Sequence, residues 1–145
     1  MSKYTEQQAN PVIESSLRMW REQGPLLRLE GTVCPGCKKK FFPPRYVCPI
    51  CHTQEVLIFR FSGTGTIANV VSNQIPQISL LGFGEHIPRY IATIELDEGP
   101  VILGEIVDVD NADLVVKGAR VSSVFRKGAR SVNGSWTYIY KFILG

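Results

Sequence analysis

The chain has 145 residues, of which 44% are hydrophobic, and a formal net charge of +3. This apolar content is enough for a core and argues against a disordered chain, and the length allows one ordinary domain or two small ones if a metal supports one of them. The opening residues MSKYTEQQANP contain no apolar stretch, and no apolar run approaches the roughly twenty residues of a membrane span. We therefore expect a cytoplasmic protein, in a reducing compartment, that does not enter a membrane.

A short amphipathic helix is predicted near the N-terminus. Asn10-Pro11 is typical of an N-cap followed by proline in the first turn, and Gly24-Pro25 is expected to end the helix. Ile13, Leu17 and Trp20 recur at i, i+4 and i+7 and therefore share one stripe. We expect this stripe to pack against the chain's own core, with a partner protein as the alternative.

Two CxxC pairs, Cys34-Pro35-Gly36-Cys37 and Cys48-Pro49-Ile50-Cys51, are separated by ten residues. Each pair places two thiolates on one tight turn, and two facing turns complete a tetrahedral sulfur cage, the closed geometry that structural zinc favours. A disulfide pair or a redox CxxC fits less well, because two evenly matched pairs suit a cage better than one reactive motif. The sequence therefore predicts a structural zinc site with the ligands Cys34, Cys37, Cys48 and Cys51.

Iron in a rubredoxin-like site uses the same four ligands. Rubredoxin-type turns usually carry glycine after the second cysteine, whereas this chain has Lys38 and His52 there. We therefore expect zinc rather than iron, with His52 as a partly exposed turn residue and not a ligand.

Residues 26–54 are predicted to form a small ribbon around the metal. The run Lys40-Phe41-Phe42 forms a strand that the double proline Pro43-Pro44 stops. Too few apolar residues lie here for an independent core, so the metal must supply much of the folding free energy.

From residue 55 onward the chain is predicted to be all β. Strands are expected over 56–72, with a bend at Gly63-Thr64-Gly65, and over 90–96, 101–107, 121–125 and 137–144. Five strands without a long helix indicate a small antiparallel barrel or sandwich. The long connection between Asn73 and Pro88 is apolar, with Leu80, Leu81 and Phe83, and either covers a barrel end or meets a ligand or partner.

The last strand presents Trp136, Tyr138, Tyr140 and Phe142 on one face. Beyond Asp113 the chain has six bases and no acid, so these aromatic rings resemble a platform on which nucleic-acid bases stack. A strand that is apolar on both faces can also be covered twice, by the barrel core and by the N-terminal helix, and we favour burial.

An ordered set of motifs over residues 11–145 resembles the Zn-ribbon/OB-fold proteins once catalogued only as domain of unknown function thirty-five. Lys38 departs from this family's usual glycine. The resemblance implies a mainly β chain with an N-terminal helical segment (1–25), a rubredoxin-like zinc ribbon (26–54) and a C-terminal five-stranded OB-fold barrel (55–145). The motifs that carry it are Cys34–Cys37, Phe42-Pro43-Pro44-Arg45, Cys48–Cys51, Gly63-Thr64-Gly65-Thr66, Pro88-Arg89-Tyr90-Ile91-Ala92, Glu95-Leu96-Asp97-Glu98-Gly99 and Gly118-Ala119-Arg120-Val121.

Members of this family accompany thiolases and hydroxymethylglutaryl-CoA synthase. The resemblance therefore implies a non-catalytic, acyl-CoA-associated subunit that bridges such enzymes or helps to hold a CoA thioester. Basic side chains could hold the phosphates of CoA, an apolar loop its pantetheine arm, and the helical stripe a partner enzyme. The respective candidates are Lys39, Lys40, Arg45 and Arg126; Leu80, Leu81 and Phe83; and Ile13, Leu17 and Trp20.

Two other functions remain open at this stage. Zinc ribbons and OB barrels also bind single-stranded nucleic acid, which makes that function the alternative. Independent catalysis has little support, because His52 and His86 are the only histidines, no GxSxG motif is present and all four cysteines are assigned to the metal. We therefore expect that the chain is not an enzyme.

Overall fold

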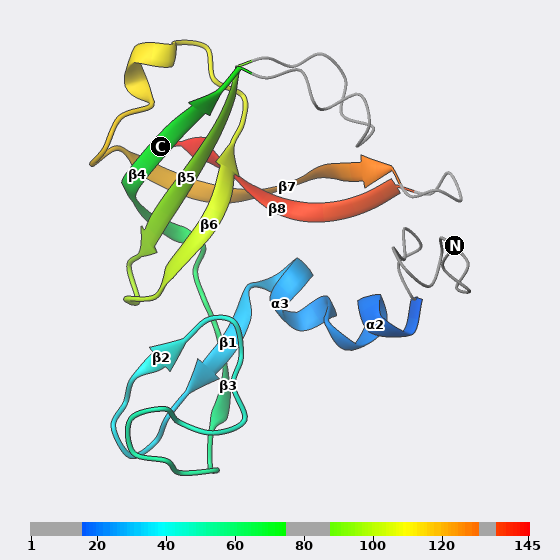
Figure 1. Cartoon of the computed structure of the whole chain (residues 1–145), viewed down its shortest axis with the longest axis vertical. Coiled ribbons are helices and arrows are strands. Elements are labelled where there is room, and N and C mark those ends of the chain that lie inside the picture. Colours follow the sequence, from blue (N-terminus) through cyan, green and yellow to red (C-terminus); the bar gives the residue numbers. More distant parts are fainter. Residues whose placement is uncertain (1–15, 75–87, 131–135) are drawn as a thin grey trace, which may run out of the picture.

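The computed structural model describes residues 16–74, 88–130 and 136–145. A small three-stranded sheet and a closed five-stranded barrel lie end to end, with two short helices beside them (Figure 1). The predicted fold, an N-terminal helical segment, a ribbon and a five-stranded barrel, is confirmed. The elements are α2 (Ser16–Arg21), α3 (Gln23–Arg28), β1 (Glu30–Val33), β2 (Lys40–Phe41), β3 (Leu57–Arg60), β4 (Thr64–Asn73), β5 (Arg89–Leu96), β6 (Val101–Ile106), the 3-10 turn η2 (Ala112–Leu114), β7 (Arg120–Arg130) and β8 (Trp136–Leu144).

The ribbon sheet has the strand order β2-β1-β3, and both pairings are antiparallel. The third strand corrects one expectation. Residues 56–61 were expected to begin the barrel, but β3 pairs with β1 from Glu30↔Arg60 to Val33↔Leu57. The bend at Gly63 therefore separates two sheets and does not bend one strand. The predicted boundary between residues 54 and 55 stays a prediction.

The barrel has the order β4-β5-β6-β8-β7 and closes where β4 pairs with β7. Its core consists of alternate residues of these strands, which point inward because side chains alternate across a strand. Gly104 on β6 is required by close packing, since a Cβ there would lie 2.5 Å from the Phe142 ring. Buried barrel residues include Ile67, Ile94, Leu96, Ile102, Ile106, Val121 and Phe142.

An apolar joint fixes the ribbon to the barrel. Leu29 and Phe61 are buried, and the Phe61 N–H donates to the Leu29 carbonyl over 3.1 Å. The ring of Phe42 meets Phe61 of the joint and Tyr140 of the barrel edge-on, at centroid distances of 6.0 and 6.4 Å. This geometry is favourable for aromatic pairs, so the two parts share one continuous apolar contact.

The helical segment differs from its prediction in two ways. Gly24-Pro25 does not end it, because α3 continues to Arg28 and Pro25 lies in the first turn of α3, where proline is tolerated. The stripe is also not covered by the described part of the chain, since Leu17 and Trp20 are 64% and 69% exposed. Burial against the chain's own core is therefore wrong for these two residues; Ile13 lies outside the described residues.

The last strand is buried over only part of its length. Phe142 is fully buried and Tyr140 half-buried, but Trp136 and Tyr138 remain 44% and 47% exposed. The reason is topological, because β6 meets β8 only at Ile106↔Phe142, and the earlier part of β8 pairs with β7 alone. Figure 1 shows these two strands running on past the rest of the barrel.

Candidate metal centre

Two tight turns hold the four cysteines at the end of the ribbon away from the barrel. In the first, the Lys38 N–H donates to the Cys34 carbonyl over 2.9 Å, and in the second the His52 N–H donates to the Cys48 carbonyl over 3.0 Å. Lys38 and His52 have φ of 57° and 58°, the left-handed conformation that glycine usually supplies. The departure from glycine noted in the sequence therefore leaves both turns intact.

The four sulfur atoms converge on one point. The Sγ atoms of the four cysteines lie within 4.8 Å of one another, with Cys34–Cys51 at 3.3 Å and Cys37–Cys48 at 3.6 Å. A tetrahedral zinc with bonds of about 2.3 Å has sulfur atoms about 3.8 Å apart. Spacing and donor chemistry both fit zinc, so this zinc ribbon has its cysteines positioned to bind a metal ion.

Backbone amides prepare one thiol of each pair for metal binding. Hydrogen bonds from the backbone of Cys51 and Ile50 lower the pKa of Cys48 to about 6, against burial, which acts in the opposite direction. A backbone hydrogen bond from Cys37 likewise lowers the pKa of Cys34. At Cys37 and Cys51 a backbone hydrogen bond also acts to lower the pKa, but burial and the neighbouring thiols outweigh it and raise the pKa, that of Cys51 to about 11. Because a metal ligand must be the thiolate, the backbone donors favour the bound state most clearly at Cys34 and Cys48.

The cage is closed as well as complete. Cys34 and Cys48 are fully buried, and four sulfur ligands saturate a tetrahedral ion. No position is left for a water or a substrate, so the chemistry of the centre is structural. The metal would tie the two turns together where the ribbon buries few apolar residues.

The structure separates the basic residues that the sequence grouped as phosphate ligands. Lys39, Lys40 and Arg45 lie on the ribbon; Lys39 and Arg45 are exposed, and the Lys40 Nζ lies 4.2 Å above the Phe59 ring. Arg126 lies on β7 of the barrel, where its guanidinium pairs with Asp108. The phosphate-binding role of these four residues stays a prediction. Leu80, Leu81 and Phe83 lie outside the described residues.

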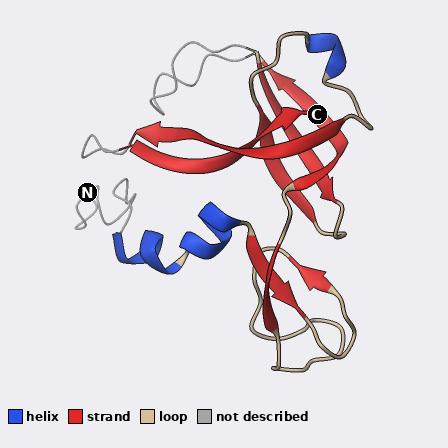
Figure 2. Cartoon of the chain, turned by 180° about the vertical axis from the view of Figure 1, so that it is seen from behind, coloured by secondary structure: helices blue, strands red, loops and turns tan. Residues whose placement is uncertain are grey.

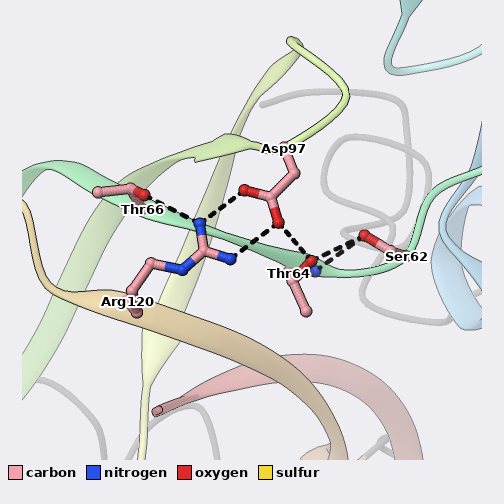
Figure 3. Close-up of polar contacts among 5 residues, drawn as sticks. All are labelled: Ser62, Thr64, Thr66, Asp97 and Arg120. Carbon is pink, nitrogen blue, oxygen red and sulfur yellow. Dashed lines mark hydrogen bonds and ion pairs between the residues drawn. The ribbon is translucent and has the colours of Figure 1, made fainter.

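Acidic partners, which the sequence could not assign, neutralise part of the basic C-terminal segment. Besides Arg126 with Asp108, Arg120 forms a two-pronged pair with Asp97, at 2.6 and 2.9 Å. Figure 3 shows this pair with the Thr64 hydroxyl, which donates to Asp97 over 2.7 Å. Hydrogen bonds from Arg120 and then Thr64 lower the pKa of Asp97 to about 2.

A third acid, Glu105, holds two bases on the outside of the barrel. Its two oxygens lie 2.6 Å from the Arg89 Nε and 2.8 Å from the Lys141 Nζ. Burial acts to raise the pKa of Glu105, but the hydrogen bonds from Arg89 and Lys141 outweigh it and the pKa is lowered. Among the described side chains, three bases beyond Asp113, namely Arg120, Arg126 and Lys141, therefore have an acidic partner from residues 95–113.

Sequence reasoning also missed several exposed apolar residues. Leu26 and Leu27 on α3 are each 38% exposed, and Phe125 on β7 is 47% exposed. The sequence signal was ambiguous, since such residues are equally typical of a core.

The helices in the described parts of the chain are all too short and too polar to span a lipid bilayer.

Comparisons with known proteins agree with this architecture. Residues 21–56 match the family model "ChsH2, rubredoxin-like zinc ribbon domain", and residues 60–126 match "ChsH2, C-terminal OB-fold domain". A solved structure titled "Ltp2-ChsH2(DUF35) aldolase" has the same fold, with a TM-score of 0.68 and 22% identity over 93% of this chain and 98% of that one.

Three curated relatives are similar along most of the chain, and each is named a DUF35 domain-containing scaffold protein. The protein of Methanocaldococcus jannaschii is 34% identical over 128 residues, which are 87% of this chain and 88% of the relative. That of Pyrococcus furiosus is 34% identical over 86% of this chain and 89% of the relative. That of Methanothermobacter thermautotrophicus is 32% identical over 90% and 97%.

Proposed function

This chain belongs to the DUF35 family of zinc-ribbon and OB-fold scaffold proteins, and from that premise we propose that it is a non-catalytic accessory subunit of acyl-CoA metabolism. It binds or bridges thiolase-type enzymes, including hydroxymethylglutaryl-CoA synthase, and helps them to hold CoA thioesters. One observation carries the proposal. The cluster of four cysteines is a closed cage, while large apolar side chains on the helices and on β7 and β8 are exposed.

The closed coordination of the four-cysteine cluster supports the non-catalytic role. In the part of the chain that the structure describes, the four cysteines form the one group of potential metal ligands, and a saturated sulfur cage neither activates water nor attacks a substrate. The curated relatives carry the word scaffold in their names. The solved relative is titled an aldolase together with a DUF35 protein, which supports association with an enzyme of carbon–carbon bond chemistry.

Holding CoA is the second part of the proposal. Lys39, Lys40 and Arg45 offer cations on one ribbon, and phosphates are bound by such charge-assisted hydrogen bonds. Arg126 is the weaker candidate, because its guanidinium already pairs with Asp108. The ribbon bases are the residues to test first.

Co-elution is the direct test of the scaffold function. The full chain is co-expressed with the thiolase-type enzyme and the hydroxymethylglutaryl-CoA synthase of the same organism, and the mixture is separated by size exclusion. We expect a stable complex that contains this chain. Separate elution of all three proteins at micromolar concentration would remove the scaffold function, and acyl-CoA turnover by the isolated chain would remove the non-catalytic role.

Calorimetry separates the ligand role from the scaffold role. We expect CoA to release heat with the assembled complex, and Lys39→Ala with Lys40→Ala to weaken that binding. No heat at high micromolar protein would exclude CoA binding and leave the scaffold function standing.

Single-stranded nucleic-acid binding is the second candidate, and one contact favours it. The Lys127 Nζ lies 5.1 Å from the centre of the exposed Trp136 ring, as a cation beside a stacking platform would. Against it, OB folds bind oligonucleotides across their second and third strands, here β5 and β6, where Arg89 is the only base and pairs with Glu105. Retention on heparin that falls steeply with salt would favour this candidate.

A further inference from the structure

Seven large apolar side chains are exposed on α2, on α3 and on the outer parts of β7 and β8. Trp20 and Leu17 on α2 are the most exposed of them, at 69% and 64%. The others range from 38% to 47%. We call this set the helix–hairpin face; its members are Leu17, Trp20, Leu26, Leu27, Phe125, Trp136 and Tyr138.

The elements that carry the helix–hairpin face are neighbours in the molecule, and the hairpin residues of the face share one side of β7 and β8. Trp136 and Tyr138 share a strand face with Tyr140, whose ring meets Phe42 of the ribbon. Phe125 is directly opposite Tyr140 on β7 and points the same way. The helix α3 packs against β8, and both views show α2 and α3 beside the projecting β7 and β8 (Figures 1 and 2).

These elements have little support from the rest of the described chain. In the described part of the chain, α2 packs chiefly against α3, which has only six residues. Beyond Ser123, β7 pairs only with β8, and two strands alone are marginal in water. A partner that covers the face would supply the missing contacts.

The exposed aromatic residues supply about half of the area that one partner of a standard interface buries. Trp20, Phe125, Trp136 and Tyr138 are between 44% and 69% exposed. At roughly 150–250 Å² for each aromatic side chain, they expose on the order of 400 Å². The leucines add to this area, and a standard interface uses roughly 800 Å² on each partner. A patch of this size is uncommon on a monomer with no function for it.

Charge at the edge of the face selects the kind of partner. Residues 16–28 contain three arginines and one glutamate, and residues 125–130 and 136–141 contain four bases and no acid. Three of these bases are paired, Arg28 with Glu30, Arg126 with Asp108 and Lys141 with Glu105. The positive charge of the edge therefore comes chiefly from Arg21 and Lys127, which are exposed at the surface. A symmetric dimer would set this basic edge against itself, because the same patch serves both subunits. The edge therefore disfavours a second copy and suits an acidic partner.

We infer that the helix–hairpin face is the surface on which the thiolase-type enzyme docks, through an apolar patch rimmed by acidic residues on that enzyme. This inference rests on the proposed function and specifies its contact surface. Aromatic anchors at the centre of an interface carry most of the binding free energy, which gives Trp20, Trp136 and Tyr138 the main role. Lys127, at the edge, acts through charge and tunes the rate of association.

The test measures binding of full-length variants to the purified thiolase-type enzyme of the same organism. We expect Leu17→Ala with Trp20→Ala, and separately Phe125→Ala with Tyr138→Ala, to weaken binding by about 30-fold or more. Lys127→Glu is expected to weaken it less and to reduce its salt dependence. All these side chains are about half-exposed or more, and a full equivalent of zinc and an unchanged unfolding midpoint check that each variant folds.

Val101→Ala with Leu103→Ala is the matched control. These two side chains are 55% and 66% exposed, but they lie on the outer face of β6 and outside the helix–hairpin face. We expect the control to bind the enzyme as the unchanged chain does.

Each outcome decides between the two levels of the proposal. Binding that survives both pairs of substitutions, or that the control alone abolishes, overturns the docking surface and leaves the scaffold function intact. An unchanged chain that does not bind the enzyme overturns the scaffold function and the inference with it. Sedimentation that finds a dimer, dissociated by Leu17→Ala with Trp20→Ala, would replace the enzyme by a second copy and so overturn the inference.

Discussion

The ribbon and the barrel are stabilised by different means within one chain. In the barrel, buried aliphatic residues and Phe142 fill a closed sheet. In the ribbon, the fully buried side chains at the far end are Cys34 and Cys48, and many of its apolar residues, such as Tyr46 and Ile58, are exposed. The comparison teaches that apolar content does not reveal where a chain is stable, because one half uses sulfur–metal bonds where the other uses packing.

The largest expected effect separates these two halves. We expect Cys48→Ser to lose its zinc and to unfold the ribbon while the barrel keeps its fold, since structural zinc contributes about 10–16 kcal/mol of apparent folding free energy in small zinc peptides. Elemental analysis gives the zinc content, and amide NMR spectra report on each half. His52→Asn, at an exposed position, is the control and should keep a full equivalent of zinc. A collapsed barrel in Cys48→Ser would show that the halves do not fold independently.

The second effect tests the barrel core alone. Phe142 is fully buried in the barrel core, with 0% of its surface accessible to solvent. Phe142→Ala should therefore lower the free energy of unfolding by about 3–5 kcal/mol. Urea titration measures this cost. Leu103→Ala, at a position 66% exposed, should stay within about 0.5 kcal/mol of the unchanged chain. Equal costs at the two positions would contradict the assignment of the core.

The third effect addresses the joint between the halves. Gly63 has φ of 81°, and a Cβ there would collide with the Ser123 side chain, whereas Gly118 has φ of 90° and open space around it. Both substitutions by alanine incur backbone strain of about 1 kcal/mol or more. We expect Gly63→Ala to cost about 1–3 kcal/mol beyond Gly118→Ala, because it must also displace β7. Equal thermal unfolding midpoints for the two variants would show that the joint is not tightly packed.

The smallest effect is a pH dependence at the same joint. The pKa of Asp97 is about 2, below its ordinary 3.8, so its carboxylate stabilises the folded chain above about pH 4, and this contribution is lost as the pH falls toward 2. The effect is modest because both partners are exposed. NMR titration measures the pKa directly. In Arg120→Gln it should return toward 3.8, and an unchanged value would show that Arg120 is not the cause.

Local spacing was enough to predict the metal centre. Each CxxC turn fixes two thiols within four residues, and two such turns ten residues apart were enough to predict the four ligands, which the ribbon then brings together. The pairing of bases with acids could not be predicted in this way. Arg120 and Asp97 are 23 residues apart and meet only because β7 and the turn after β5 are neighbours in the closed barrel.

The sequence by itself determined the features that depend on near neighbours: the sulfur cage, the strands and their alternation, and the ordered motifs of the family. The tertiary structure decided which strand belongs to which sheet, and which apolar residues are covered. Leu17, Trp20 and Phe142 are equally apolar in sequence, yet the first two are exposed and the third is buried. The physical reason is that burial depends on which segments fold against one another, and contacts between distant segments leave no local pattern.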